Sequence, residues 1–152
     1  MFDGIISFVE YDELFLDKSW LWLNDPEIKE LTLTPNFTKK QQQTFFDNLS
    51  EREDYKIWGV KHDGYAIGVV GLKNITEYDV EYFGYIGEKQ YWDRGMFKYL
   101  FKHILEECLL LNLSTIYLHV SSNNKRAIKA YVNKGFYEVE TLNEIMKLEF
   151  KL

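Results

Sequence analysis

Residues 80–97, VEYFGYIGEKQYWDRGMF, constrain the fold more than any other part of this sequence. Residues 80–86 alternate aromatic and β-branched residues with smaller ones, which is typical of a β-strand. From residue 96 onward the pattern changes, because apolar residues recur every three or four positions as in an amphipathic helix. These residues are Met96, Tyr99, Leu100, Ile104, Leu105 and Cys108. The stretch therefore predicts a strand, a short glycine-containing loop and a helix of roughly four turns.

The loop between that strand and that helix contains Arg94 and Gly95. The free N–H groups at the start of a helix, together with the helix dipole, favour an anion. Glycine has no Cβ, so a ligand can approach the backbone closely at this point. The functional interpretation is a phosphate site, and the alternative is a simple turn in which Asp93 caps the helix.

A second informative segment covers residues 114–136, STIYLHVSSNNKRAIKAYVNKGF. Residues 116–120 form an apolar strand that ends in a run of serine and asparagine, which favour turns and helix N-caps. A short helix follows, and Gly135 ends it at the position expected for a left-handed C-terminal cap. The segment therefore predicts strand, turn, helix and a further extended stretch.

Taken together, the two segments resemble the GNAT superfamily of acyl-CoA-dependent N-acetyltransferases. The second segment resembles the closing signature of that superfamily, which here reads Asn124-Lys-Arg-Ala127, then Tyr131, then Gly135-Phe136. The resemblance covers residues 55–136. It implies a mixed α/β fold with a mostly antiparallel central sheet flanked by helices.

The first segment resembles the pyrophosphate-binding loop of the same superfamily at one key position and differs from it at two others. That loop usually reads Gln or Arg, two residues, Gly, one residue, then Gly or Ala. Gly95 is retained, but Trp92 stands where Gln or Arg is usual and Phe97 where a small residue is usual. These differences affect the expected phosphate contacts and leave the resemblance in fold intact.

The order of the predicted elements agrees with this resemblance. It is a strand, two helices, three antiparallel strands, a helix, a strand, a helix and one or two strands in the tail. Thr38 is expected to cap the second helix, and His62-Asp63-Gly64 to form a hairpin turn. Exposed strands in the tail are compatible with a homodimer.

Length and composition limit the class of protein. A chain of 152 residues, 46% hydrophobic and 28% charged, predicts a single soluble domain spanning residues 1–152. The formal net charge of −6 argues against nucleic acid or an anionic membrane as the main partner. Cys108 is the only cysteine, and no His, Asp and Glu set has metal-ligand spacing, so we expect no disulfide and no metal. Asp3 interrupts the start of the chain, so we expect no signal peptide and a cytoplasmic protein.

Direct transfer of an acetyl group from a thioester to an amine needs a neutral amine, a stabilised oxyanion and a proton for the thiolate. Glu81 is the first candidate for the base, acting directly or through water, because the resemblance often places a glutamate on this strand. The alternative is an exposed carboxylate at the start of a strand. The resemblance gives Tyr131 the role of acid at the thiolate, and the alternative is a packed aromatic ring.

The resemblance also implies acetyl-CoA as co-substrate. The central strand would serve the oxyanion and the pantetheine amides through its backbone, the loop would bind the pyrophosphate, and the asparagine of the closing signature would contact the pantetheine arm. The predicted cofactor-binding residues are Tyr85, Ile86, Gly87, Trp92, Asp93, Arg94, Gly95, Met96, Phe97 and Asn124.

The acceptor is the least constrained part of the prediction. In the superfamily its pocket is built largely from the region that corresponds to residues 20–46. Residues 22–28 look similar both to enzymes that acetylate nucleotide-linked amino sugars and to the ribosomal-protein N-terminal acetyltransferase branch. Small size and aromatic richness favour the amino sugar, with a protein N-terminus or a polyamine as alternatives. The candidate acceptor-binding residues are Trp22, Asn24, Tyr78, Tyr82 and His119.

The histidines leave further alternatives open. His119 is a second candidate for the base. The alternative is a structural residue whose ring nitrogens are satisfied by hydrogen bonds, because a lone histidine can have either role. His62 is expected in a turn and His103 on the surface of a helix. A non-catalytic acyl-CoA-binding module remains the alternative to an enzyme, suggested by Trp92 and Phe97.

Overall fold

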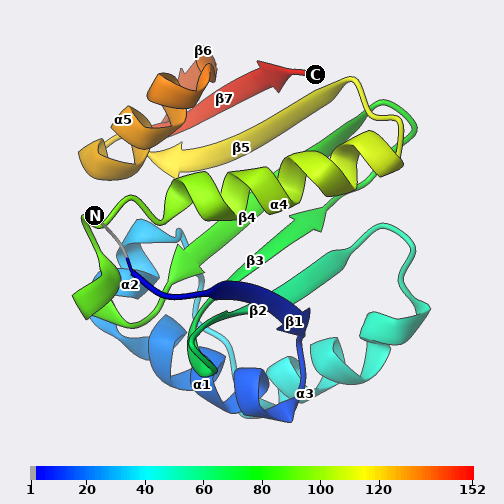
Figure 1. Cartoon of the computed structure of the whole chain (residues 1–152), viewed down its shortest axis with the longest axis vertical. Coiled ribbons are helices and arrows are strands. Elements are labelled where there is room, and N and C mark those ends of the chain that lie inside the picture. The colour runs from blue at the N-terminus through cyan, green and yellow to red at the C-terminus, as the bar shows by residue number, and fades with distance from the viewer. Residues whose placement is uncertain (1–2) are drawn as a thin grey trace.

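Seven strands form one sheet in the order β1-β2-β3-β4-β5-β7-β6 (Figure 1). The computed structural model describes residues 3–152. The strands are β1 (Ile6–Glu10), β2 (Lys56–His62), β3 (Tyr65–Lys73), β4 (Asp79–Ile86), β5 (Thr115–Ser121), β6 (Tyr137–Leu142) and β7 (Ile145–Lys151). The helices are α1 (Glu13–Asn24), α2 (Pro26–Leu31), α3 (Lys39–Asn48), α4 (Phe97–Leu110) and α5 (Lys125–Lys134), with 3₁₀ turns at η1 (Leu49–Glu51) and η2 (Lys89–Tyr91).

The pairing of β4 with β5 decides the shape of the sheet. Every other neighbouring pair is antiparallel, whereas β4 and β5 run parallel. Their register covers only Asp79↔Thr115, Val80↔Ile116 and Glu81↔Tyr117, and the two strands then separate (Figure 1). The mixed, mostly antiparallel sheet expected from the sequence is confirmed. The separation leaves the β5 side of β4 without a partner strand beyond Glu81 among the described residues.

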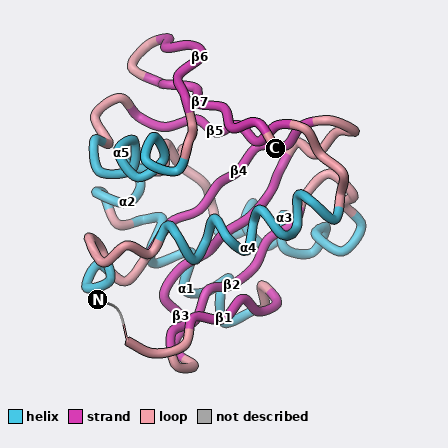
Figure 2. The backbone as a smooth tube through the Cα atoms, turned by 45° about the horizontal axis from the view of Figure 1, so that its top comes forward, coloured by secondary structure: helices cyan, strands magenta, loops and turns pink. Residues whose placement is uncertain are grey.

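Helices cover both faces of the sheet, as the tube view also shows (Figure 2). On one face α4 packs along β3, β4 and β5, and its Ile104 and Cys108 are fully buried. On the other face α1 and α2 pack on β2, β3 and β4 through a smaller core around Phe15 and Ile28. Alternate residues of β4 serve the two faces, because successive side chains in a strand point in opposite directions.

Local sequence signals set the ends of the helices. Thr38 forms a capping box with Gln41 at the start of α3, and Asp25 caps α2 just before Pro26. Gly135 ends α5 with φ of 112°, a conformation that favours glycine. The Thr38 cap and the Gly135 terminator confirm the sequence predictions, but three helices, and not the two expected, lie between β1 and β2. Within residues 3–152, no helix is both long and apolar enough to cross a membrane.

Candidate active site

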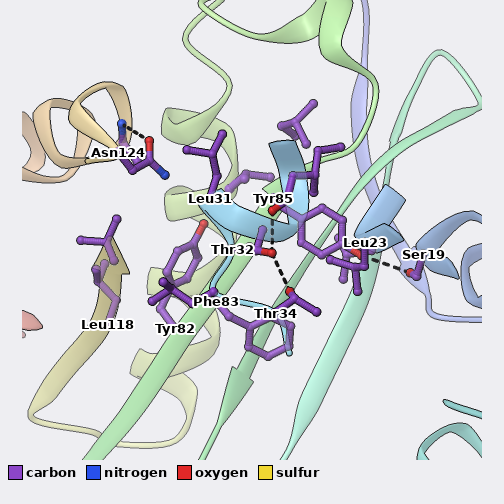
Figure 3. Close-up of a pocket in the computed structure, with 18 of the residues that line it drawn as sticks. Ser19, Leu23, Leu31, Thr32, Thr34, Tyr82, Phe83, Tyr85, Leu118 and Asn124 are labelled. Atoms are coloured by element: carbon purple, nitrogen blue, oxygen red, sulfur yellow. Dashed lines mark hydrogen bonds between the residues drawn. The ribbon is translucent and has the colours of Figure 1, made fainter. Parts of the chain in front are cut away.

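A cavity of about 640 Å³ opens where β4 and β5 separate (Figure 3). Its floor is β4 and its sides come from β5, the start of α4, α5 and the segment that follows α2. The close-up shows Thr32 and Thr34 on one side of Tyr82, and Leu118 and Asn124 on the other. The cavity therefore has two halves, one beside α4 and α5 and one beneath α2 and α3.

The loop at the start of α4 has open space above its glycine and no side-chain cap on the helix. Gly95 has φ of +70°, and a Cβ added there would meet no atom within 4 Å. Met96 precedes the helix and its side chain forms no capping hydrogen bond, so no side chain caps the start of α4. Within the first turn, the Tyr99 and Leu100 N–H groups donate to the Met96 carbonyl. The alternative that Asp93 caps the helix is wrong, because Asp93 itself adopts φ of 61° and its carboxylate pairs with Arg126.

Trp92 anchors this loop to β4 through a hydrogen bond, and its ring packs against a cation. Its indole N–H donates to the carbonyl of Ile86 at 2.8 Å. The Arg126 guanidinium lies 4.4 Å from the ring centroid of Trp92, and its Nη1 lies 3.3 Å from Asp93 Oδ2. A guanidinium from α5 thus stands beside the loop whose first position lacks the usual Gln or Arg. It adds positive charge where the first turn of α4 already favours an anion.

Glu81 lies at the point where β4 and β5 part, and its side chain is only 12% exposed. Its Oε1 accepts a hydrogen bond from Asn74 Nδ2 at 3.0 Å, and its Oε2 lies 2.9 Å from His119 Nδ1. Lys73 Nζ lies 4.0 Å from the same Oε2. The alternative of an exposed carboxylate at a strand start is wrong, since Glu81 is buried, partnered and part of the cavity lining.

Tyr131 of α5 also lines the cavity, and its ring packs edge-on against Phe97 with centroids 4.9 Å apart. Loss of solvent around the phenol raises the pKa of Tyr131 to about 12. Burial likewise raises the pKa of the neighbouring Tyr82 well above its usual value. Both phenols are therefore protonated at neutral pH and can act as hydrogen-bond donors.

The half of the cavity beneath α2 and α3 is lined by hydroxyl groups and aromatic rings. Ser19 of α1 is buried and accepts from the Tyr11 hydroxyl at 2.8 Å and from the Tyr85 hydroxyl at 3.2 Å. The hydroxyl oxygens of Thr32 and Thr34 lie 2.6 Å apart (Figure 3). Sequence reasoning missed these three small residues, because nothing in their spacing separates them from ordinary helix and loop residues.

Most of the predicted site residues meet at this cavity. Those that line it are Glu81, Tyr82, Tyr85, Ile86, Trp92, Asp93, Gly95, Met96, Phe97, His119, Asn124 and Tyr131. Asn124 accepts from the Ala127 N–H at 3.3 Å, so it caps α5 while it faces the cavity. The fold thus brings together predicted residues from β4, β5, α4 and α5 that are far apart in the chain.

The remaining predicted residues lie outside the lining. Trp22 is buried, and its ring occupies the space where a Cβ on Gly87 would stand. Its indole N–H donates to the Glu88 carboxylate at 2.7 Å. Asn24 is exposed and its side-chain amide donates to the backbone of α1. The other two are Tyr78, 66% exposed before β4, and Arg94, whose guanidinium lies over the Tyr91 ring.

His103 corrects a further expectation, because it does not lie freely on the surface of α4. Its ring stacks on Phe8 with centroids 4.1 Å apart and meets Trp58 edge-on. Its Nε2 is buried and has no hydrogen-bond partner within the described residues, and burial lowers the pKa of His103. Within residues 3–152, no group of three or more His, Cys, Asp and Glu side chains is arranged to hold a metal ion.

Comparisons with known proteins identify the family and the fold of this chain. The sequence model of the Acetyltransferase (GNAT) family matches residues 18–136. The acetyltransferase PseH of Campylobacter jejuni is 24% identical over 135 residues, which cover 86% of this chain and 82% of PseH.

Solved structures share the whole fold at low identity. A domain from Methanocaldococcus jannaschii superposes with a TM-score of 0.86 at 18% identity, covering 99% of this chain and all of that one. PseH in complex with acetyl coenzyme A gives a TM-score of 0.75 at 19% identity, covering 97% and 99% of the two chains. Spermidine N-acetyltransferase from Vibrio cholerae, in complex with CoA and spermine, gives 0.85 at 19%, covering 96% and 95%.

Proposed function

Since this chain belongs to the Acetyltransferase (GNAT) family and is an acetyl-CoA-dependent N-acetyltransferase, we propose that it acetylates the amino group of a nucleotide-linked amino sugar by direct transfer. The observation that carries this proposal is the buried, partnered Glu81 in the lining of a cavity that also includes the start of α4 and the segment that follows α2. A base in this lining would serve a thioester bound beside α4 and α5 and an amine bound beneath α2.

Acetyl-CoA fits the half of the cavity beside α4 and α5. The uncapped first turn of α4, Gly95 and Arg126 would hold the pyrophosphate through N–H groups and a guanidinium. The unpartnered edge of β4 offers backbone groups to the pantetheine amides, and Asn124 faces the same space. Acetyl-CoA itself supplies the activated acetyl group.

The transfer step needs two protons removed from the nitrogen and one supplied to the thiolate. A base centred on Glu81, directly or through water, removes the first proton from the acceptor ammonium, and the neutral amine then attacks the thioester carbonyl. The β4 backbone would stabilise the oxyanion that forms on the carbonyl oxygen. As the C–S bond breaks, the attacking nitrogen loses its second proton to solvent and Tyr131 donates its phenolic proton to the departing thiolate. Solvent then returns a proton to the phenol. The position of Tyr131 in the cavity lining supports this assignment.

The charge of the lining supports an amino sugar over a polyamine. Among the described residues that line the cavity, two carboxylates, Glu81 and Asp93, stand against two long-chain cations, Lys73 and Arg126. A polyamine carries several positive charges and is best bound by an excess of carboxylates. Hydroxyls such as those of Thr32 and Thr34, together with aromatic faces, suit the hydroxyls and ring of a sugar.

Three other functions are alternatives to this proposal. A polyamine acceptor is favoured by the structural likeness to the spermidine N-acetyltransferase, and a protein N-terminus by the resemblance of residues 22–28. A non-catalytic acyl-CoA-binding module would follow from the bulky Trp92 and Phe97 in the loop.

The test is release of free CoA thiol from acetyl-CoA in the presence of three acceptors, namely a UDP-linked amino sugar, spermidine and a short peptide with a free N-terminus. We expect turnover to be fastest with the amino sugar and to fall strongly in Tyr131→Phe. Preferred turnover of spermidine or of the peptide would refute the choice of acceptor. Thermal stabilisation by acetyl-CoA without turnover of any amine would indicate a binding module.

A further inference from the structure

Both oxygens of the Glu81 carboxylate are already engaged before any substrate binds. Asn74 Nδ2 donates to Oε1, and His119 Nδ1 lies within hydrogen-bond distance of Oε2. An ionised carboxylate has no hydrogen to donate, so the shared proton belongs to His119 Nδ1. Glu81 therefore selects the tautomer in which His119 Nε2 carries a lone pair.

His119 is placed to use that lone pair. Its side chain is 41% exposed, whereas that of Glu81 is 12% exposed. No residue that the structure describes forms a hydrogen bond with its Nε2. His119 lines the main cavity and also a second, smaller groove, named the outer groove, beside Glu140, Leu142 and Lys147. The imidazole thus connects the place where the amine would bind with bulk water.

We propose that His119 Nε2 is the atom that removes the proton from the acceptor, and that Glu81 is the positioning residue that holds and stabilises it. This inference rests on the proposed function, because it concerns the base of the same acetyl transfer. It assigns the base to a pair of residues from β4 and β5 instead of to the carboxylate alone.

The proton balance of this step is simple. The acceptor ammonium loses one N–H proton to His119 Nε2, directly or through one water, and becomes the neutral nucleophile. The imidazolium that forms keeps its Nδ1–H bond to the Glu81 carboxylate, whose charge compensates it. After the acetyl group has moved, the proton leaves Nε2 to water in the outer groove, and the first tautomer is restored.

Charged groups around the imidazole come from each neighbouring strand. Glu81 of β4 makes the only direct contact among the described residues, at 2.9 Å. The other titratable groups that surround the pair are Lys73 on β3, Tyr117 on β5, Glu140 on β6, and Lys147 and Glu149 on β7. Lys147 lies 3.8 Å from Glu149, whereas Lys73 lies 4.0 Å from Oε2 of Glu81 itself. His119 Nδ1 is nearer to that oxygen, at 2.9 Å, so Glu81 remains the main influence on the imidazolium.

The test compares His119→Ala, Glu81→Gln and the double variant, each first shown to be stabilised by acetyl-CoA as the wild type is. We expect His119→Ala to lower kcat by about 10²–10³-fold and to lose the acid limb of the pH profile. Added imidazole, which can enter through the outer groove, should restore part of the rate in His119→Ala but none in Glu81→Gln. The double variant should be little slower than His119→Ala, because the two residues act as one unit.

A second measurement does not depend on turnover. Two-bond ¹H–¹⁵N spectra of the wild type at pH 8 should show His119 with a protonated Nδ1 and an unprotonated Nε2, and Glu81→Gln should lose this preference. A protonated Nε2 in the wild type, or His119→Ala within about threefold of wild-type kcat across the pH range, would overturn the inference. If the wild type turns over no amine at all, the proposed function itself fails, which is a different result.

Discussion

Replacing Gly95 with alanine tests the phosphate site at the start of α4 with little disturbance elsewhere. A Cβ at Gly95 would meet no protein atom within 4 Å, so the substitution causes no clash inside the fold. The φ of +70° makes an L-residue unfavourable by about 1–2 kcal/mol. Lower entropy of the unfolded chain offsets about 0.4–1 kcal/mol of this. The net loss of stability is then about 1 kcal/mol, or about 2–4 °C in Tm for a domain of this size.

Binding of acetyl-CoA should suffer more than stability does. The new methyl group projects into the open space that we assign to the pyrophosphate, so it prevents the phosphate from reaching the backbone N–H groups. We expect Kd for acetyl-CoA, measured by isothermal titration calorimetry, to rise at least tenfold, which corresponds to about 1.4 kcal/mol.

Gly64 provides the matched control for this experiment. It has φ of +87°, a Cβ there would also meet nothing within 4 Å, and it lies in the turn between β2 and β3, outside the cavity lining. Gly64→Ala should therefore lose similar stability and bind acetyl-CoA as the wild type does. Equal affinities in the two variants would refute the assignment of the Gly95 loop to the phosphates.

Three further predictions follow from single contacts. Tyr131→Phe should lower kcat about 10–100-fold while acetyl-CoA still raises Tm, because the ring stays packed and only the acidic proton is lost. An unchanged kcat in the thiol-release assay would show that Tyr131 is not the acid. Arg126→Ala should weaken acetyl-CoA binding about tenfold in calorimetry, because a cation over Trp92 is lost, and Arg126→Lys should weaken it less. Burial lowers the pKa of His103 below its unfolded value, so the unfolded chain binds the proton first and stability falls as the pH drops below about 6.5. His103→Phe should thus lose less Tm than the wild type between pH 7 and pH 5, and equal losses would contradict this account.

Sequence patterns were sufficient for the elements because the patterns are local. The alternation in residues 80–86 and the apolar repeat after residue 96 depend only on strand and helix periods, and β4 and α4 appear where they indicate. The Thr38 cap and the Gly135 terminator depend on neighbours within four residues. The spacing from Asn124 to Phe136 depends likewise on one turn and one helix, so the family signature was visible in the chain.

Burial was predicted less successfully than the helices and strands, because the sequence pattern around an aromatic residue is the same in a core and in a binding pocket. Trp22 looked suitable for an acceptor, yet it packs behind Gly87 and bonds to Glu88. His103 looked exposed on its helix until β1, with Phe8, covered it. Such outcomes depend on which element lies above a residue, and periodicity carries no information about that.

By itself, the sequence determined most of the elements, their order and the family, since each follows from local spacing and from residue types in a short motif. The separation of α2 from α1 and the number of tail strands came only from the structure. Tertiary structure alone decided which candidate residues contact one another in the site. Glu81 and His119 are 38 positions apart and meet only because β4 and β5 pair in parallel before they separate. Arg126 likewise reaches Trp92 only because α5 lies beside the start of α4. Distances between side chains from different elements depend on how those elements pack, which no local pattern in the chain encodes.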